Sequence, residues 1–171
     1  ETYYAKRDMG GGVILDAASH AIDLLIWIFG RVREVVAMHD RMVFEGVECE
    51  DTALMLLRFE SGAMAQLSLN QFQKPNVQVF EVIGTEANLK LDMADLAVAV
   101  DDSGTWEHTD YAAGVDPMTI HENRFALQAN LYLDALEGKQ IPLATLDEAR
   151  HNLAVALAAR VSYEEKRIIR L

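Results

Sequence analysis

An apolar stretch from Gly10 to Gly30 has the periodicity of an α-helix led by a run of three glycines. Gly30 is placed to end the helix, since glycine is favoured just beyond a helix C-terminus. At about 3.6 residues per turn, Asp16, His20 and Asp23 fall on one narrow stripe. The stretch contains no Lys or Arg beside its apolar residues, so it lacks the charged face of a surface helix. We therefore expect a helix that is covered nearly all round, with its polar stripe in or beside a cavity.

Beyond this helix, β-branched and aromatic runs alternate with short polar turns, which is the pattern of successive antiparallel strands. The expected strands are residues 32–43, 53–59, 63–69, 77–83, 88–92, 97–100 and a short piece near Trp106. The expected later helices are residues 121–136 and 147–165. The sequence thus predicts an α+β fold, a mainly antiparallel open β-sheet with helices packed on one face, in a single domain spanning residues 1–171.

Both faces of the predicted sheet carry apolar side chains. Along residues 53–59, Met55 and Leu57 point to one face while Leu54 and Leu56 point to the other. A strand with one solvated face would alternate apolar with polar residues, and large exposed apolar patches are unusual on monomers. We expect the face opposite the helices to form a homodimer or larger oligomer. Cover by a further domain or by long connections is the alternative.

Asp16 precedes His20 by four residues, the spacing at which a helix can join a carboxylate to an imidazole by a hydrogen bond. Such a pair can act as a general acid/base histidine oriented by an aspartate. It can equally be a structural pair that ties the helix to its neighbours. The spacing alone leaves both interpretations open.

The residues Gly-Gly-Gly-x-x-x-Asp-x-x-x-His-x-x-Asp, followed by Gly30, resemble the signature that opens one domain of a known family. This is the C-terminal domain of the glucose–fructose oxidoreductase, inositol dehydrogenase and MocA family. Further segments resemble family motifs in the same order: a hairpin at 51–63, a Gly-Thr-x-Gly-x-Leu turn at 83–89 and a loop at 141–149. Ala18 and Ala87 depart from this pattern, because the family often has glycine at both positions.

The resemblance implies the substrate-binding and catalytic-histidine half of an NAD(P)-dependent oxidoreductase acting on a sugar, polyol or related hydroxy compound. His20 would transfer the hydroxyl proton and Asp16 would orient it. Asp23, Gly11 and Gly12 would contact the substrate. A structural hydrogen bond is the alternative role for Asp23, and a hinge is the alternative for the glycines.

NAD or NADP would bind to an N-terminal Rossmann domain of the full-length protein, which residues 1–171 do not contain. We therefore expect this fragment alone to hold no cofactor and to be inactive. The run of three glycines fits neither the dinucleotide nor the Walker pattern. The alternative function is a non-catalytic ligand-binding or dimerisation domain of the same fold.

Charge and cysteine content argue against several classes of binding partner and indicate a cellular location. The formal net charge of −12 argues against nucleic acid and against anionic membrane surfaces. A lone cysteine, Cys49, is typical of a reducing cytoplasm. No spacing of Cys and His indicates a metal site, so we expect none. The acidic run including Glu50 and Asp51 is predicted to be a solvated loop, and His151 and Arg160 to lie on a helix surface.

Overall fold

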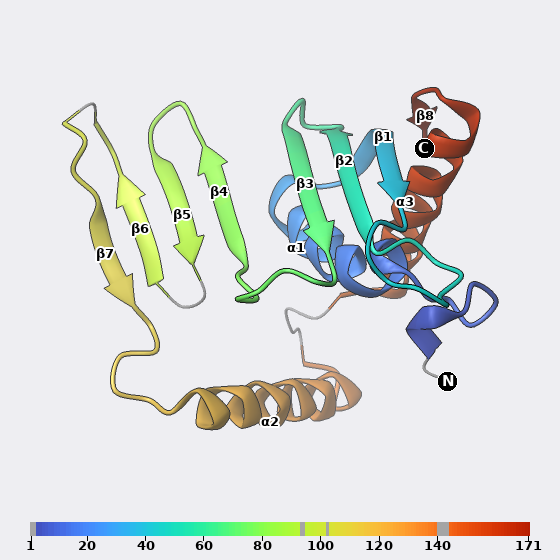
Figure 1. Cartoon of the computed structure of the whole chain (residues 1–171). Helices are drawn as coiled ribbons and strands as arrows, with labels where there is room; N and C mark the ends of the chain where they lie inside the picture. Colours follow the sequence, from blue (N-terminus) through green and yellow to red (C-terminus); the bar gives the residue numbers. More distant parts are fainter. Residues whose placement is uncertain (1–2, 93–94, 102, 140–143) are drawn as a thin grey trace. The chain divides into compact units, whose positions relative to one another are not determined.

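A computed structural model describes residues 3–92, 95–101, 103–139 and 144–171. The chain divides into two compact units (Figure 1): residues 1–72 with 144–171, and residues 73–143. No helix in the described part of the chain is both long and apolar enough to cross a membrane. Each unit is described separately below.

The helix that follows the glycines forms in two parts. The 3-10 turn Tyr3–Ala5 comes first, and a π-helical segment Ile14–Ala18 then leads directly into α1, Ser19–Phe29. As predicted, α1 ends at Gly30, which has a φ of +84° and donates its N–H to the carbonyl oxygen of Ile26 at 2.9 Å. A residue with a Cβ would be strained at this backbone angle, which is why glycine suits the position.

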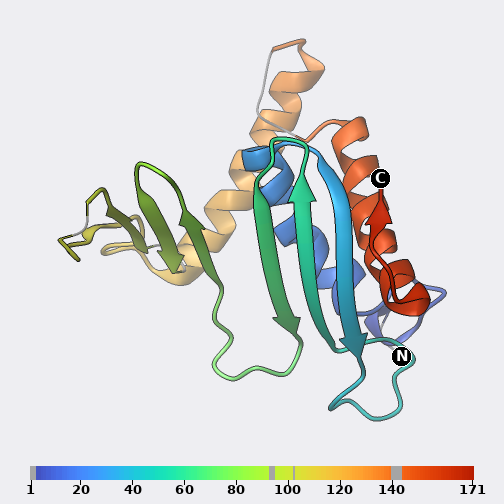
Figure 2. The ribbon, with the colours of Figure 1, turned by 90° about the horizontal axis from the view of Figure 1, so that it is seen from above.

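The first unit contains a 4-stranded antiparallel sheet in the order β3-β2-β1-β8. Its strands are β1 Val32–Asp40, β2 Thr52–Phe59, β3 Met64–Asn70 and β8 Ile169–Arg170. Helix α1 and helix α3, Leu146–Glu165, both lie against one face of this sheet (Figure 2). The short strand β8, which the sequence did not predict, pairs with β1 after α3 has ended.

The core of the first unit lies between the sheet and the two helices. Along β2, alternate residues are buried, and Phe59 is fully enclosed and packs against Phe29 with ring centroids 5.5 Å apart. The buried set from the strands and helices includes Ile22, Val32, Val35, Met55, Leu57, Val155 and Ala159. This period of two matches a sheet that is covered on its inner face.

The opposite face of this sheet, here called the outer sheet face, carries exposed apolar side chains beside the exposed polar residues Arg58, Gln66 and Ser68. It presents Val36, Met38, Leu54, Leu56 and Met64, which lie near one another because β1, β2 and β3 pair in register. Met38, Leu54, Leu56 and Met64 are 66%, 52%, 57% and 74% exposed. The prediction that both faces carry apolar residues is therefore confirmed for this sheet.

The second unit is a meander of four antiparallel strands followed by one helix. The strands are β4 Val79–Ile83, β5 Asn88–Asp92, β6 Asp95–Ala99 and β7 Glu107–Asp110, in the order β4-β5-β6-β7. Helix α2, Pro117–Leu136, begins with Asp116 as its N-cap. The Asp116 carboxylate accepts the Thr119 N–H at 3.1 Å.

The predicted α+β fold with antiparallel strands is confirmed. The strands are divided between two sheets, one in each unit, and a polar segment containing Pro75 separates β3 from β4. Proline lacks the N–H that continues a strand ladder, so this segment interrupts strand pairing. The first predicted strand was too long, because β1 ends at Asp40.

Replacing Leu57 by alanine should destabilise the protein by about 2 to 5 kcal/mol, because the change leaves a cavity in the core. The matched change at Leu153 on α3, which is 52% exposed, should cost under about 1 kcal/mol. Denaturant unfolding of both variants measures the difference. Equal costs would contradict the strand register, since a one-residue slip exchanges the two faces of β2.

Candidate functional site

The three-glycine turn is closed by its own backbone. The N–H groups of Gly10, Gly11 and Gly12 donate to the carbonyl oxygens of Arg7, Lys6 and Tyr4 at 3.2, 2.9 and 3.1 Å. Because these donors are already used, the turn has no free N–H groups with which to cradle a phosphate. The described residues of this turn therefore do not fit the pyrophosphate of a dinucleotide.

A buried ion pair lies directly under this turn. Glu50 is 4% exposed, and its Oε1 accepts from Arg160 at 2.8 Å and from the backbone N–H of Ile14 at 3.3 Å. Arg160 also donates to the carbonyl oxygen of Gly11. Gly12 has a φ of +98°, and a Cβ there would collide with the Glu50 carboxylate and with Arg160. Only glycine can therefore occupy this position without moving the ion pair.

Gly11 also has no room for a side chain, because the backbone of the N-terminal turn lies against it. A Cβ at Gly11 would come within 2.7 Å of the carbonyl oxygens of Tyr3 and Tyr4. Both glycines are buried. The structure therefore places them as close-packing positions between the N-terminal turn and the Glu50–Arg160 pair, and their predicted contact with substrate stays a prediction.

Asp16 lies in the π-helical segment and is half-buried. Its Oδ1 accepts the hydroxyl of Tyr3 at 2.7 Å, and the Gln71 side-chain amide approaches its Oδ2 at 3.5 Å. The hydrogen bond to the Asp16 carboxylate and its negative charge raise the pKa of the Tyr3 hydroxyl above its ordinary value. Asp16 is thus held by residues from the N-terminal turn and from the end of β3.

The expected direct hydrogen bond between Asp16 and His20 is wrong. Among the described residues, Asp16 bonds to Tyr3 and Gln71, and no hydrogen bond joins it to His20. The reason is that partners 13 and 55 residues away in sequence occupy its oxygens. A pattern read within one helix cannot reveal such competitors.

His20 is exposed, and so are Leu24, Trp27 and Ile28 on the following turns of α1. These four residues form an exposed stripe, in which Trp27 is 72% exposed, while Asp23 is half-buried. The expectation that the helix is covered nearly all round is therefore wrong for this chain. Two surface hollows of about 360 and 370 Å³ lie elsewhere, lined by other residues.

Asp51 is a buried residue that the sequence placed in a solvated loop, and that prediction is wrong. Its carboxylate accepts three backbone N–H groups, from Met42, Val43 and Phe44, at 2.8–2.9 Å. Burial alone would raise the pKa of this carboxyl. The backbone donors, led by Met42 and Phe44, outweigh burial and hold the pKa below its ordinary value. In the sequence, the sign of such a carboxylate, which binds backbone N–H groups, is an acidic residue immediately before a strand, as Asp51 is before β2.

His151 was predicted on a helix surface, but it is buried, with 6% of its surface exposed. The backbone N–H of Val32 donates to its Nε2 at 3.0 Å, and the Arg31 guanidinium lies 3.2 Å from its Nδ1. Burial, reinforced by the charge of Arg31, lowers the pKa of His151 below its ordinary value. The neutral ring therefore joins α3 to the start of β1.

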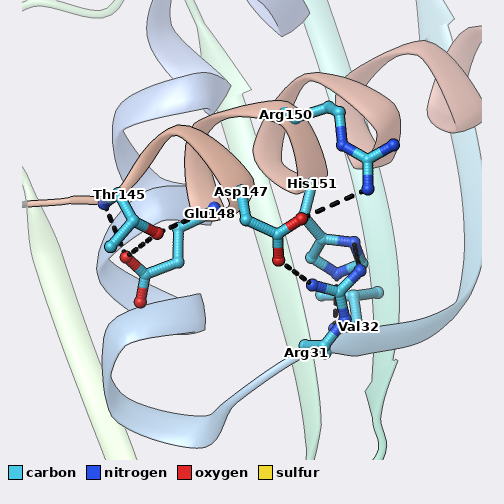
Figure 3. Close-up of polar contacts among 7 residues, drawn as sticks. All are labelled: Arg31, Val32, Thr145, Asp147, Glu148, Arg150 and His151. Atoms are coloured by element: carbon cyan, nitrogen blue, oxygen red, sulfur yellow. Dashed lines mark hydrogen bonds and ion pairs between the residues drawn. The ribbon is translucent and has the colours of Figure 1, made fainter.

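Around His151, the first turn of α3 is fixed by polar contacts (Figure 3). Thr145 caps the helix and exchanges hydrogen bonds with Glu148 in a capping box. Asp147 accepts from Arg31 at 2.9 Å and from Arg150 at 3.2 Å. No group of three or more His, Cys, Asp and Glu side chains in the described ranges could hold a metal ion.

Comparison with known proteins relates this chain to dehydrogenases. A sequence model of the GFO/IDH/MocA C-terminal domain matches residues 1–90. The myo-inositol 2-dehydrogenase of Thermotoga maritima is 24% identical over 169 residues, which are 95% of this chain and 50% of that protein. The chain thus spans about half the length of this curated relative.

Solved structures of dehydrogenases share the fold. A levoglucosan dehydrogenase in complex with NADH and levoglucosan has a TM-score of 0.82 and 18% identity, over 99% of this chain and 53% of that chain. The WlbA dehydrogenase of Bordetella pertussis, in complex with NADH and UDP-GlcNAcA, has a TM-score of 0.66 and 24% identity, over 100% of this chain and 51% of that chain. At these identities the likeness establishes the fold alone.

The lowered pKa of His151 predicts that the free energy of unfolding falls as the pH drops below about 6.5, the ordinary pKa of a histidine. The folded chain keeps this ring neutral while the unfolded chain protonates it near pH 6.5, so stability is full above that pH and falls as the pH drops toward the folded pKa. His151→Gln should flatten the fall of the unfolding free energy across this range. The control His108→Gln, at an exposed strand residue, should keep it. An unchanged slope in His151→Gln would contradict the assignment.

Proposed function

The chain belongs to the GFO/IDH/MocA family as a C-terminal domain, and from this premise we propose that it is the substrate-binding, proton-transferring half of an NAD(P)-dependent dehydrogenase. The substrate is a sugar, a polyol or a related hydroxy compound. One observation carries the proposal: an exposed histidine, His20, stands one helical turn after a carboxylate, Asp16, that is held in place. Around His20 lies the uncovered apolar stripe of α1.

The proposed chemistry of this chain is the movement of one proton. Oxidation of an alcohol removes a hydride from carbon and a proton from oxygen. NAD(P), bound to the other half of the protein, supplies the hydride acceptor. His20 takes the hydroxyl proton, and the negative charge of Asp16 one turn away stabilises the imidazolium that forms. Asp23, half-buried one turn further along α1, is proposed to hold a second substrate hydroxyl.

Sequence length and surface character support a division of labour between two halves. The chain matches only 50% of the length of the myo-inositol 2-dehydrogenase, and the N–H groups of its glycine turn are already used. We therefore propose that a separate Rossmann domain binds the dinucleotide. The exposed Leu24, Trp27 and Ile28 beside His20 suit a surface that this domain and its cofactor cover.

The relatives support the substrate class. The levoglucosan dehydrogenase holds levoglucosan, and the WlbA dehydrogenase holds UDP-GlcNAcA. Both ligands are sugars or sugar derivatives. The cytoplasmic location stays a prediction, and the support for it is that Cys49 is buried as a free thiol.

A second copy of the chain is the proposed cover of the outer sheet face. Four of its five apolar residues are more than half exposed, and their side chains point away from the helices. A second sheet packed against this one would bury them all. This surface also favours the alternative function, a non-catalytic dimerisation or ligand-binding domain, which needs the sheet face and does not need His20.

In the protein that carries this chain with its nucleotide-binding half, His20→Asn should lower kcat by about a hundredfold or more, the usual size of general acid/base catalysis. The assay follows NAD(P)H formation with myo-inositol and levoglucosan. The matched control His108→Asn, on β7, should keep the wild-type rate. Unchanged kcat in His20→Asn would instead favour the non-catalytic domain.

Sedimentation equilibrium of the chain at micromolar concentration should give about twice the monomer mass of 19.1 kDa. Leu56→Glu on the outer sheet face should shift the protein to monomer, because it buries a charge in the interface. Leu153→Glu, the same change at an exposed residue of α3, should leave the dimer intact. A wild-type chain that sediments as a 19.1 kDa monomer would rule out the proposed interface.

A further inference from the structure

We propose that Tyr3 and Gln71 are positioning residues of the candidate active site, because both contact the carboxylate of Asp16 one helical turn before His20. This inference rests on the proposed function and adds two residues to it. Neither residue belongs to the glycine-led helix. Both come from segments that only the folded chain brings beside Asp16.

The contact of Tyr3 is the stronger of the two. Its hydroxyl donates to Oδ1 of Asp16 at 2.7 Å, a typical length for a hydrogen bond to an ionised oxygen. The turn that carries it is fixed, because Lys6 N–H donates to the Tyr3 carbonyl at 3.1 Å and the Tyr3 and Tyr4 rings pack edge to face. The missing Cβ of Gly11 lets this turn lie close to the helix.

Gln71 contacts the other oxygen of the Asp16 carboxylate. Its side-chain amide lies 3.5 Å from Oδ2, and its backbone N–H donates at 3.0 Å to the carbonyl oxygen of Asp51. Asp51 is itself fixed by three backbone donors. The position of Gln71 is therefore set by the buried end of β2 rather than by the solvent-exposed chain after β3.

Together, the contacts from Tyr3 and Gln71 restrict the orientation of the Asp16 carboxylate. A carboxylate has about four lone-pair positions, and these contacts use one on each oxygen. With both oxygens held, the carboxylate cannot rotate freely toward solvent. It keeps a fixed negative charge beside the turn that carries His20, and its remaining lone pairs can accept a substrate hydroxyl.

If the Tyr3 hydroxyl served only to stabilise the fold, its removal would lower the unfolding midpoint and leave turnover unchanged. Tyr3 is 53% exposed, and exposed polar pairs add little to folding stability. Loss of the Tyr3 hydroxyl should therefore affect turnover and not the unfolding midpoint. This contrast makes the inference testable.

The test compares Tyr3→Phe with its neighbour Tyr4→Phe in the protein that carries both halves. Tyr3→Phe should lower kcat about five- to tenfold, with the KM for the dinucleotide and the unfolding midpoint unchanged, since one hydrogen bond to a partly exposed charge is lost. Tyr4→Phe should match the wild type, and Gln71→Leu should lower kcat by about two- to threefold. Equal kcat in Tyr3→Phe and Tyr4→Phe would overturn the inference while leaving His20 in its proposed role.

A second readout does not depend on activity. In the chain with ¹³C-labelled tyrosine, the Tyr3 ring should titrate above pH 10, and Asp16→Asn should return it toward the ordinary value of 10.0. A Tyr3 titration that is insensitive to Asp16→Asn would overturn the contact itself. A wild-type protein without dehydrogenase activity would overturn the proposed function and this role together, and the titration would still show whether the contact exists.

Discussion

The buried ion pair between Glu50 and Arg160 is the contact on which the arrangement of the first unit depends. It joins α3 to the residues before β2, to the glycine turn through Gly11, and to the start of the π-helical segment through Ile14. Removing one partner of such a pair leaves an uncompensated buried charge, which typically costs about 3 to 5 kcal/mol. The pair also explains Gly12, since any side chain there would occupy the same space as the two charged groups. The Glu50–Arg160 pair therefore fixes the start of the helix that carries the candidate site.

From this anchor, a series of hydrogen bonds leads to the candidate site. Asp51 follows Glu50 directly, binds the backbone of residues 42–44 and receives the N–H of Gln71 on its carbonyl oxygen. Gln71 in turn approaches Asp16. Glu50 therefore fixes the glycine turn and α3. The adjacent Asp51 fixes residues 42–44 and the chain at the end of β3. The position of Asp16 depends on both.

Local sequence pattern was sufficient for the parts of the fold that depend on periodicity. The helix ending at Gly30, the hairpin of β2 and β3, and the two apolar faces of β2 all follow from spacing, and the structure confirms them. It was insufficient wherever burial depends on a distant partner. Glu50 and Asp51 look like solvated acids until Arg160 and the backbone N–H groups are placed around them.

The same limit applies to the site and to the sheets. Asp16 and His20 have the spacing of a bonded pair, yet Tyr3 takes the carboxylate because a turn 13 residues earlier folds beside it. The division of the strands into two sheets was also hidden, since the polar segment after β3 resembles the turns within each sheet. Such features arise because segments far apart in the sequence compete for the same contacts in the folded chain. No single stretch of sequence reveals that competition.

The first unit presents two apolar surfaces that face in opposite directions. Helix α1 lies on the inner face of the sheet, and its exposed stripe of Leu24, Trp27 and Ile28 points away from the buried Ile22 and Leu25. The outer sheet face lies on the other side of the same sheet. The two surfaces share no residue. In the proposed enzyme, the nucleotide-binding half covers the stripe beside His20 and a second copy covers the sheet, so that dimerisation does not obstruct the site.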